Sequence, residues 1–322
     1  MPAKGVFRVG GLGTAVGACV LLVAGLSACG SSGRPSAGGA ESSGPTGSPA
    51  KPSGANPSGP SGSSTAAPEP SGTPTKTPAP SPTATAGLRL PPRHAGFDYQ
   101  IGGAYPPPPG ARIVSRDRTA SPAPGLYNIC YVNAFQSQPD ERASWPTDLL
   151  LRDSQGKVVV DEDWGEALLD IRTPAKRERV AARIDKWIDG CAAKGFDAVE
   201  PDNYDSYTRS RHLLTANDAT AFITLLSRHA HARHLAIAQK NTVELAGLRK
   251  RTGLDFAVAE ECAEYDECGA YAKAFDDRVV VIEYSDSGLR KARSGFGDRL
   301  SIVRRDVMVS TPGSVDYVRK VR

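Results

Sequence analysis

The chain has 322 residues, with 39 Lys and Arg against 35 Asp and Glu, and its formal net charge is +4. Five of the basic and two of the acidic residues precede residue 88, so the rest of the chain is almost neutral. A balanced charge gives no support for nucleic-acid binding, which depends on clustered positive charge.

The N-terminus has the pattern of an export signal. Lys4 and Arg8 precede an apolar run that ends in Leu-Ser-Ala-Cys at Cys29. A basic start, an apolar run and small residues at the cleavage point predict a signal peptide over residues 1–28. The ending is similar to a bacterial lipobox, which implies a lipid on Cys29 and an anchor on the extracytoplasmic face of the cell membrane. The alternative is an ordinary secretory signal with an incidental cysteine.

Residues 29–87 form a linker rich in Ser, Gly, Pro, Thr and Ala. After Cys29 this stretch has no aromatic residue and no Leu, Ile or Val. Such a composition cannot bury enough apolar surface to offset chain entropy, so we expect a disordered spacer. Residues 88–322 then have the length of one large, monomeric domain.

Eight segments of this domain have the composition of short strands. They cover residues 97–102, 111–114, 125–133, 196–200, 235–239, 256–259, 279–282 and 300–303. Residues 134–172 are expected to be irregular. Helices are predicted after Thr173, where Pro174 follows a good N-cap and Gly195 supplies the stop, after Thr215, over 243–250 and within 268–275.

From the fourth strand onward, strands and helices alternate. This order predicts an α/β fold, a (β/α)₈ TIM barrel whose early helices are reduced or missing. An open doubly wound sheet is the alternative. The chain has neither Gly-x-Gly-x-x-Gly nor a Walker motif, so no nucleotide cofactor is expected.

Four cysteines remain in the domain, namely Cys130, Cys191, Cys262 and Cys268. Export to an oxidising compartment favours disulfides, and three pairings are possible. Cys262 and Cys268 are close enough in sequence to close a small loop, which leaves Cys130 for Cys191. A zinc site is the alternative, but there is no Cys-x-x-Cys pair.

Polar residues end several of the predicted strands. The stretch Gly195–Tyr207 places Glu200, Asp202 and Asn203 after a strand, and Pro201 is expected to end its regular pairing. Further strands end in Lys240-Asn241, in Glu260-Glu261 and in Glu283. The carboxyl ends of parallel strands meet at one rim, where α/β barrels carry their active sites.

A rim with several carboxylates suits hydrolysis of a glycosidic bond. One carboxyl group protonates the leaving oxygen, and a second attacks the sugar or activates water. Metal binding is the competing use, but the histidines lack the His-Glu-x-x-His spacing, so we expect no metal and no other cofactor.

From about Phe97 to Asp286 the sequence resembles glycoside hydrolase family 114, the endo-α-1,4-polygalactosaminidases. The resemblance rests on Cys130-Tyr131-Val132, Leu169-Asp170-Ile171-Arg172, Gly195–Asn203, Lys240-Asn241, Glu260-Glu261-Cys262 and Ile282-Glu283-Tyr284. It implies a barrel that hydrolyses α-1,4-linked galactosamine or N-acetylgalactosamine polysaccharide by a metal-free retaining mechanism.

Carried over by motif, the resemblance makes Asp202 the nucleophile and Glu260 the general acid/base. It implies that a further set of residues contacts the sugar: Tyr131, Asp170, Arg172, Glu200, Asn203, Lys240, Asn241, Glu261, Glu283 and Tyr284. The sequence departs from the family pattern after Val132, where Asn133 stands, and at Ser115-Arg116-Asp117, where an acidic residue is expected sooner.

Two other functions fit the same residues. One is a non-catalytic glycan-binding lipoprotein on a barrel scaffold. The other is a glycosidase of different specificity, such as an α-galactosidase, because carboxylates at a rim do not encode the sugar.

Overall fold

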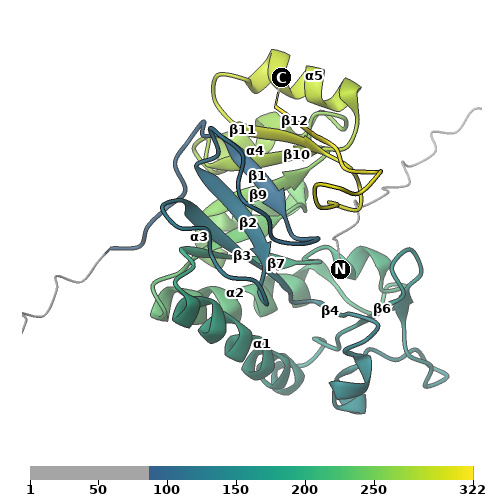
Figure 1. Cartoon of the computed structure of the whole chain (residues 1–322). Coiled ribbons are helices and arrows are strands. Elements are labelled where there is room, and N and C mark those ends of the chain that lie inside the picture. Colours follow the sequence, from purple (N-terminus) through teal and green to yellow (C-terminus); the bar gives the residue numbers. More distant parts are fainter. Residues whose placement is uncertain (1–86, 322) are drawn as a thin grey trace, which may run out of the picture. The chain divides into compact units, whose positions relative to one another are not determined.

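The computed structural model describes residues 87–321, and the predicted signal peptide, Cys29 and the linker up to residue 86 lie outside this range. One nine-stranded sheet dominates the fold (Figure 1). Its parallel strands, in order, are β1 (Phe97–Gln100), β2 (Ile113–Asp117), β3 (Tyr127–Asn133), β7 (Ala198–Asp202), β8 (Ala236–Lys240), β9 (Phe256–Glu260), β10 (Val279–Glu283) and β11 (Ser301–Arg305). The short β12 (Arg319–Lys320) runs antiparallel to β11.

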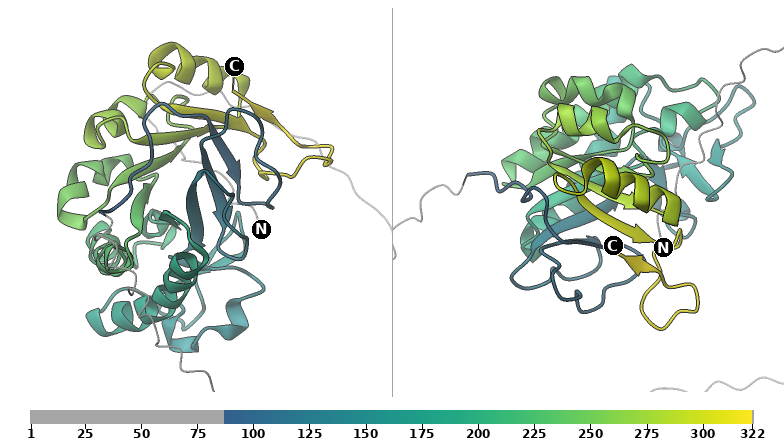
Figure 2. Two further views of the ribbon diagram at one scale, coloured as in Figure 1. Left: turned by 60° about the vertical axis from the view of Figure 1, so that its left-hand side comes forward. Right: turned by 90° about the horizontal axis from the view of Figure 1, so that it is seen from above.

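The sheet curls until its first and last parallel strands, β1 and β11, lie side by side (Figure 2). Side chains bridge this seam. The hydroxyl of Ser301 accepts a hydrogen bond from the Ala95 amide at 2.9 Å. Arg319 of β12 donates to Asp98 Oδ1 at 2.8 Å and to the Phe97 carbonyl at 3.3 Å. The predicted TIM-barrel fold is therefore confirmed.

Helices lie along the outer side of the curled sheet (Figure 2). They are α1 (Pro174–Lys194), α2 (Ala216–Ala232), α3 (Arg249–Thr252), α4 (Cys268–Ala274) and α5 (Asp286–Phe296). Within residues 87–321 none follows β1 or β2 directly, as the sequence predicts. None of the helices in this range is long and apolar enough to cross a bilayer.

The predicted helix ends are confirmed for α1 and α2. Thr173 caps α1 by accepting a hydrogen bond from the Lys176 amide, and Gly195 ends it with a φ of 88°. Thr215 and Asp218 form a capping box at the start of α2. These signals are local, so the sequence alone reveals them.

Side chains alternate between the barrel interior and the layer under the helices. In β7 and β8 the interior positions include Ala198, Ala236 and Ala238, whereas Val199 and Ile237 face the helices. Because the period is two, Glu200, Asp202 and Lys240 continue the interior series toward the carboxyl ends of their strands. This alternation decides which residues at the carboxyl ends of the strands point into the barrel and can contact one another.

The long segment 134–172 is not irregular, contrary to the prediction. It forms a small antiparallel sheet in the order β4 (Gln136–Ser137), β6 (Glu166–Leu168), β5 (Val160–Asp161), with 3₁₀ turns η1 (Arg142–Ser144) and η2 (Thr147–Leu149). Strands of two or three residues are too short to give a periodic signal. This insertion brings Glu166 to the barrel mouth.

Two other boundaries differ from the prediction. β7 continues through Pro201, which pairs with Val132 of β3, and ends at Asp202. Its pairing with β8 stops at Val199, so the missing amide of Pro201 costs no hydrogen bond on that side. The predicted helix over 243–250 is the 3₁₀ helix η4 (Val243–Leu248) followed by α3.

The four domain cysteines form two disulfides. Cys130 of β3 is bonded to Cys191 of α1, and Cys262 is bonded to Cys268 at the start of α4. The first ties the sheet to a helix, and the second closes the loop that follows β9. Of the three possible pairings, the structure thus has the one that the short spacing of Cys262 and Cys268 favours.

Candidate active site

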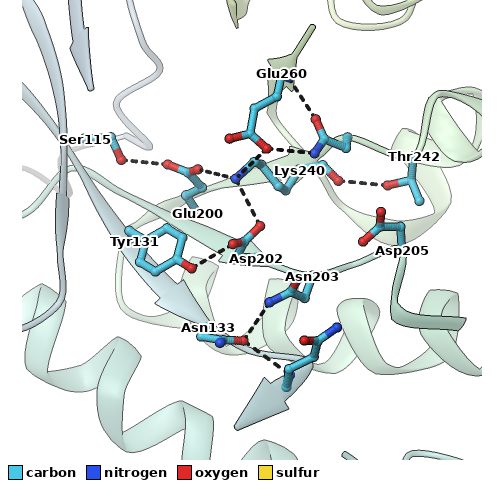
Figure 3. A network of polar contacts seen from close by, with 12 residues as sticks. Ser115, Tyr131, Asn133, Glu200, Asp202, Asn203, Asp205, Lys240, Thr242 and Glu260 are labelled. Carbon is cyan, nitrogen blue, oxygen red and sulfur yellow. Dashed lines mark hydrogen bonds and ion pairs between the residues drawn. The ribbon is translucent and has the colours of Figure 1, made fainter. Parts of the chain in front are cut away.

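Lys240, the last residue of β8, lies at the centre of a cluster of carboxylates (Figure 3). Its ammonium group is 3.0 Å from Asp202 Oδ1, 3.3 Å from Glu200 Oε1 and 3.4 Å from Glu260 Oε2. Only 1% of the lysine side chain is exposed. The three acids come from β7 and β9, the strands on either side of β8, so the topology brings them together.

Asp202 is held by two donors, one on each oxygen. Lys240 contacts Oδ1, and the Tyr131 hydroxyl donates to Oδ2 at 2.7 Å. Burial alone would raise the pKa of Asp202, but the Lys240 charge and the Tyr131 hydrogen bond outweigh burial and hold that pKa below its ordinary value. Asp202 is therefore ionised at neutral pH.

Glu260 is held at both oxygens. The Tyr284 hydroxyl donates to Oε1 at 2.5 Å, and the Asn241 amide donates to Oε2 at 3.0 Å. Asn241 also accepts a hydrogen bond from the Glu260 backbone amide at 2.9 Å. Tyr284 and Asn241 thus orient the Glu260 carboxyl group.

Glu200 lies one interior position below Asp202 and is fully buried. Tyr99 donates to Oε1 at 2.7 Å, and Ser115 donates to Oε2 at 2.6 Å. Burial raises the pKa of Glu200 against the opposing effects of Lys240 and Ser115. Both oxygens of Glu200 accept hydrogen bonds within the protein, whereas the family resemblance implies that Glu200 contacts the sugar.

A second group of polar residues lies beside Asp202. Asn133, at the end of β3, donates to Glu166 Oε2 at 2.9 Å and accepts from Asn203 at 3.0 Å. Burial and the nearby Asp202 together raise the pKa of Glu166 to about 7, against the hydrogen bond from Asn133. Arg209 donates to Asn203 Oδ1 at 3.0 Å and pairs with Asp161 of the insertion at 2.7 Å.

The backbone turns sharply after three of the rim strands. Asn203, Asn241 and Glu261 have φ values of 64°, 48° and 55°. Each directly follows the last interior residue of its strand. A left-handed residue there breaks the alternation, so Asn203 and Asn241 reach the mouth although strand parity points them away from it.

Three predicted sugar-contacting residues lie apart from the cluster. Asp170 is buried and forms ion pairs with Arg172 at 2.7 Å and Lys176 at 2.6 Å, at the start of α1. Glu283 occupies the outer series of β10, where its Oε1 accepts from the Ala263 amide at 2.9 Å. The Asp170 ion pairs hold the start of α1, and the Glu283 hydrogen bond holds the loop after β9, whereas the family resemblance implies that these residues contact the sugar.

Glu261 follows Glu260 directly and is half-buried. Burial, with the neighbouring Glu260, raises its pKa to about 7. Among residues 87–321, the group of metal-ligand types that lies close enough to hold an ion is Cys262, Cys268 and Glu283. The two sulfurs of that group are bonded to each other, so they are not available as thiolates.

Sequence reasoning missed five residues of the site, namely Tyr99, Ser115, Asn133, Glu166 and Arg209. Tyr99 and Ser115 follow the interior parity of β1 and β2, so counting from Phe97 and Ile113 would have found them. In the sequence, Ser115 and Asn133 stand out only as departures from the family pattern. Glu166 and Arg209 lie outside the barrel strands, and no periodic signal marks them.

We predict that Lys240→Met destabilises the protein by about 3 to 5 kcal/mol at pH 7, because it leaves three buried carboxylates without their cation. Lys240 lowers the pKa values of Asp202 and Glu200, so without it these pKa values rise in the folded state, and the loss shrinks as pH falls and the two acids take up protons. Urea unfolding at pH 7 and pH 5 measures both effects. Lys157→Met, at an exposed position, is the control and should change stability by less than about 0.5 kcal/mol. A destabilisation of Lys240→Met that is equal at both pH values would contradict the prediction.

Comparison with known proteins identifies the family. Residues 77–321 match the glycoside-hydrolase family GH114. The chain is similar to the solved structure of Aspergillus fumigatus Ega3 in complex with galactosamine, with 23% identity, a TM-score of 0.59, and coverage of 71% of this chain and 98% of that chain. It is also similar to the glycoside hydrolase domain of PelA from Pseudomonas aeruginosa, with 13% identity, a TM-score of 0.45, and coverage of 68% and 96%. A comparison with curated proteins gave no match. Because the family match covers most of the chain, the protein belongs to glycoside-hydrolase family GH114 and is a glycoside hydrolase.

Proposed function

We propose that the enzyme cleaves α-1,4-linked galactosamine or N-acetylgalactosamine polysaccharide, with Asp202 and Glu260 as its catalytic pair. Family membership supports the reaction class. The similar Ega3 structure, which was solved with galactosamine, supports the sugar. The contact of both carboxylates with the one buried Lys240 is the observation that carries the assignment.

Asp202 has the properties of a nucleophile in this proposal. It is ionised, and Tyr131 and Lys240 fix its two oxygens. In the first step Asp202 attacks the anomeric carbon while Glu260 donates a proton to the departing glycosidic oxygen. The new Glu260 carboxylate then lies beside Lys240, Asn241 and Tyr284, all of which stabilise its negative charge.

In the second step the roles of Glu260 reverse. Its carboxylate removes a proton from a water molecule, which attacks the anomeric carbon and releases Asp202. Two inversions at the same carbon retain the anomeric configuration. No metal or other cofactor enters this scheme.

The spacing of the two carboxylates supports retention. Asp202 Oδ1 and Glu260 Oε2 lie 3.0 and 3.4 Å from the same nitrogen, so they are no farther apart than the sum of these distances. That limit, which concerns one oxygen of each group, is compatible with the separation of about 5 to 5.5 Å in retaining pairs.

We predict that Asp202→Asn and Glu260→Gln each lower the release of reducing ends from galactosamine polymers by at least about 10²-fold. Both substitutions preserve size, so thermal unfolding should show a folded protein. Asp163→Asn, at an exposed position on the insertion, is the matched control and should retain activity.

Full activity of either variant would overturn the assignment of that residue. A wild-type protein that binds the polymer without cutting it would support the glycan-binding alternative instead. Parallel assays with galactose and glucose polymers test for a glycosidase of other specificity.

We also propose that the enzyme works at the extracytoplasmic face of the cell membrane, anchored by a lipid on Cys29. The Leu-Ser-Ala-Cys ending and the long spacer after it support this location.

We predict that a labelled fatty acid is incorporated into the wild type and that Cys29→Ser abolishes the label and releases the protein from membranes. If the wild-type protein is not found in the membrane fraction and its mature N-terminus is not Cys29, the signal is an ordinary secretory one.

A further inference from the structure

We propose that Gln239 is a positioning residue for Glu260, which it orients from behind the sheet through the turn at Asn241 and Thr242. This inference rests on the proposed role of Glu260 as general acid/base. Gln239 lies one residue before Lys240, and its side chain therefore belongs to the outer series of β8. Its two hydrogen bonds go to the turn after β8 and not to the carboxylate cluster.

A glutamine in this position requires a physical reason. It is fully buried, and its cross-strand partner is Ala257 in the apolar layer between the sheet and the helices. A buried amide is costly unless it is hydrogen-bonded, and among residues 87–321 only the nitrogen of this amide has partners, because Oε1 is buried without one. The amide nitrogen of Gln239 donates to the carbonyl of Asn241 at 2.9 Å and to that of Thr242 at 2.8 Å. Two carbonyl acceptors also fix which end of the amide is the nitrogen.

The two carbonyls belong to consecutive residues in the left-handed region. Asn241 has a φ of 48° and Thr242 a φ of 60°, and neither is a glycine. For the β-branched Thr242 this conformation is especially unfavourable. Such strain persists only where the surrounding structure holds it in place. Gln239 provides two of the restraints, and the Thr242 hydroxyl provides a third by donating to the Lys240 carbonyl at 2.8 Å.

The turn determines where the Asn241 side chain points. If β8 continued as a regular strand, Asn241 would belong to the outer series like Gln239, and its side chain would face away from the mouth. In the left-handed conformation it reaches Glu260, donating to Oε2 at 3.0 Å and accepting from the backbone amide at 2.9 Å. Gln239 therefore acts on Glu260 by keeping Asn241 in a position that strand geometry alone would not give.

The test replaces Gln239 by Met, which has similar length and no hydrogen-bond donor. We expect Gln239→Met to lower kcat on galactosamine polymer by about 10- to 100-fold, with little change in KM, because the acid is displaced while the sugar contacts remain. Asn241→Ala should have a similar effect, and the double variant should be no worse than Asn241→Ala alone, because both act through one contact.

A rescue variant separates positioning from mere packing. Glycine adopts positive φ at no steric cost, so Thr242→Gly in the Gln239→Met background should restore part of the lost kcat. Thr252→Val is the matched control, since Thr252 is also buried and its hydroxyl also donates to two carbonyls, those of Leu248 and Arg249. It should leave kcat unchanged.

Hydrogen exchange of the Glu260 amide, measured by NMR, gives a readout that needs no substrate. We expect faster exchange in Gln239→Met and in Asn241→Ala, and wild-type exchange in Thr252→Val. Wild-type kcat and exchange in Gln239→Met, or additive losses in the double variant, would overturn the inference. If the wild type cuts none of the polymers, the proposed function fails, and the exchange measurement still decides whether Gln239 holds the Asn241–Glu260 contact.

Discussion

One buried cation organises the mouth of this barrel. Lys240 contacts Glu200, Asp202 and Glu260 although almost none of its side chain is exposed. Burial lowers the pKa of Lys240, but the three carboxylates outweigh burial and keep that pKa well above its ordinary value. Three acids still exceed one ammonium, and burial, with a smaller contribution from Asp202, raises the pKa of the deepest one, Glu200. The same cation holds the pKa of Asp202 below its ordinary value, as the proposed role of Asp202 as nucleophile requires.

Most of the barrel and the centre of its site could be predicted from sequence, because both follow from strand periodicity. Four strands end in acidic or basic residues, and parallel topology places those ends on one rim. The alternation of side chains along each strand then decides which of these end residues face the barrel interior. Asp202, Lys240 and Glu260 share the interior series of their strands, whereas Glu283 follows Val281 on the outer series and holds the Ala263 amide instead. A count of alternate residues along β10 would have separated Glu283 from the cluster.

The rest of the site depends on features that break this periodicity. Asn241 reaches Glu260 only because two successive residues adopt positive φ, and nothing in the local sequence predicts a left-handed threonine. Glu166 arrives on a strand of three residues inside a segment that the sequence marks as irregular. Arg209 links that insertion to Asn203 through tertiary contacts alone. Asn241, Glu166 and Arg209 surround the carboxylate cluster, which the sequence predicts, and they shape the space in which a sugar would lie.

In the proposed mechanism Asp202 forms a covalent bond to the sugar while Glu260 transfers the proton. Reaction of the enzyme with a fluorinated galactosaminyl fluoride, which slows breakdown of the intermediate, followed by mass spectrometry, would detect this bond. We expect one added sugar on the peptide that contains Asp202, and greater accumulation in Glu260→Gln, where breakdown is slower. An adduct on Glu260 or Glu166, or turnover of the reagent with inversion and no adduct, would contradict it.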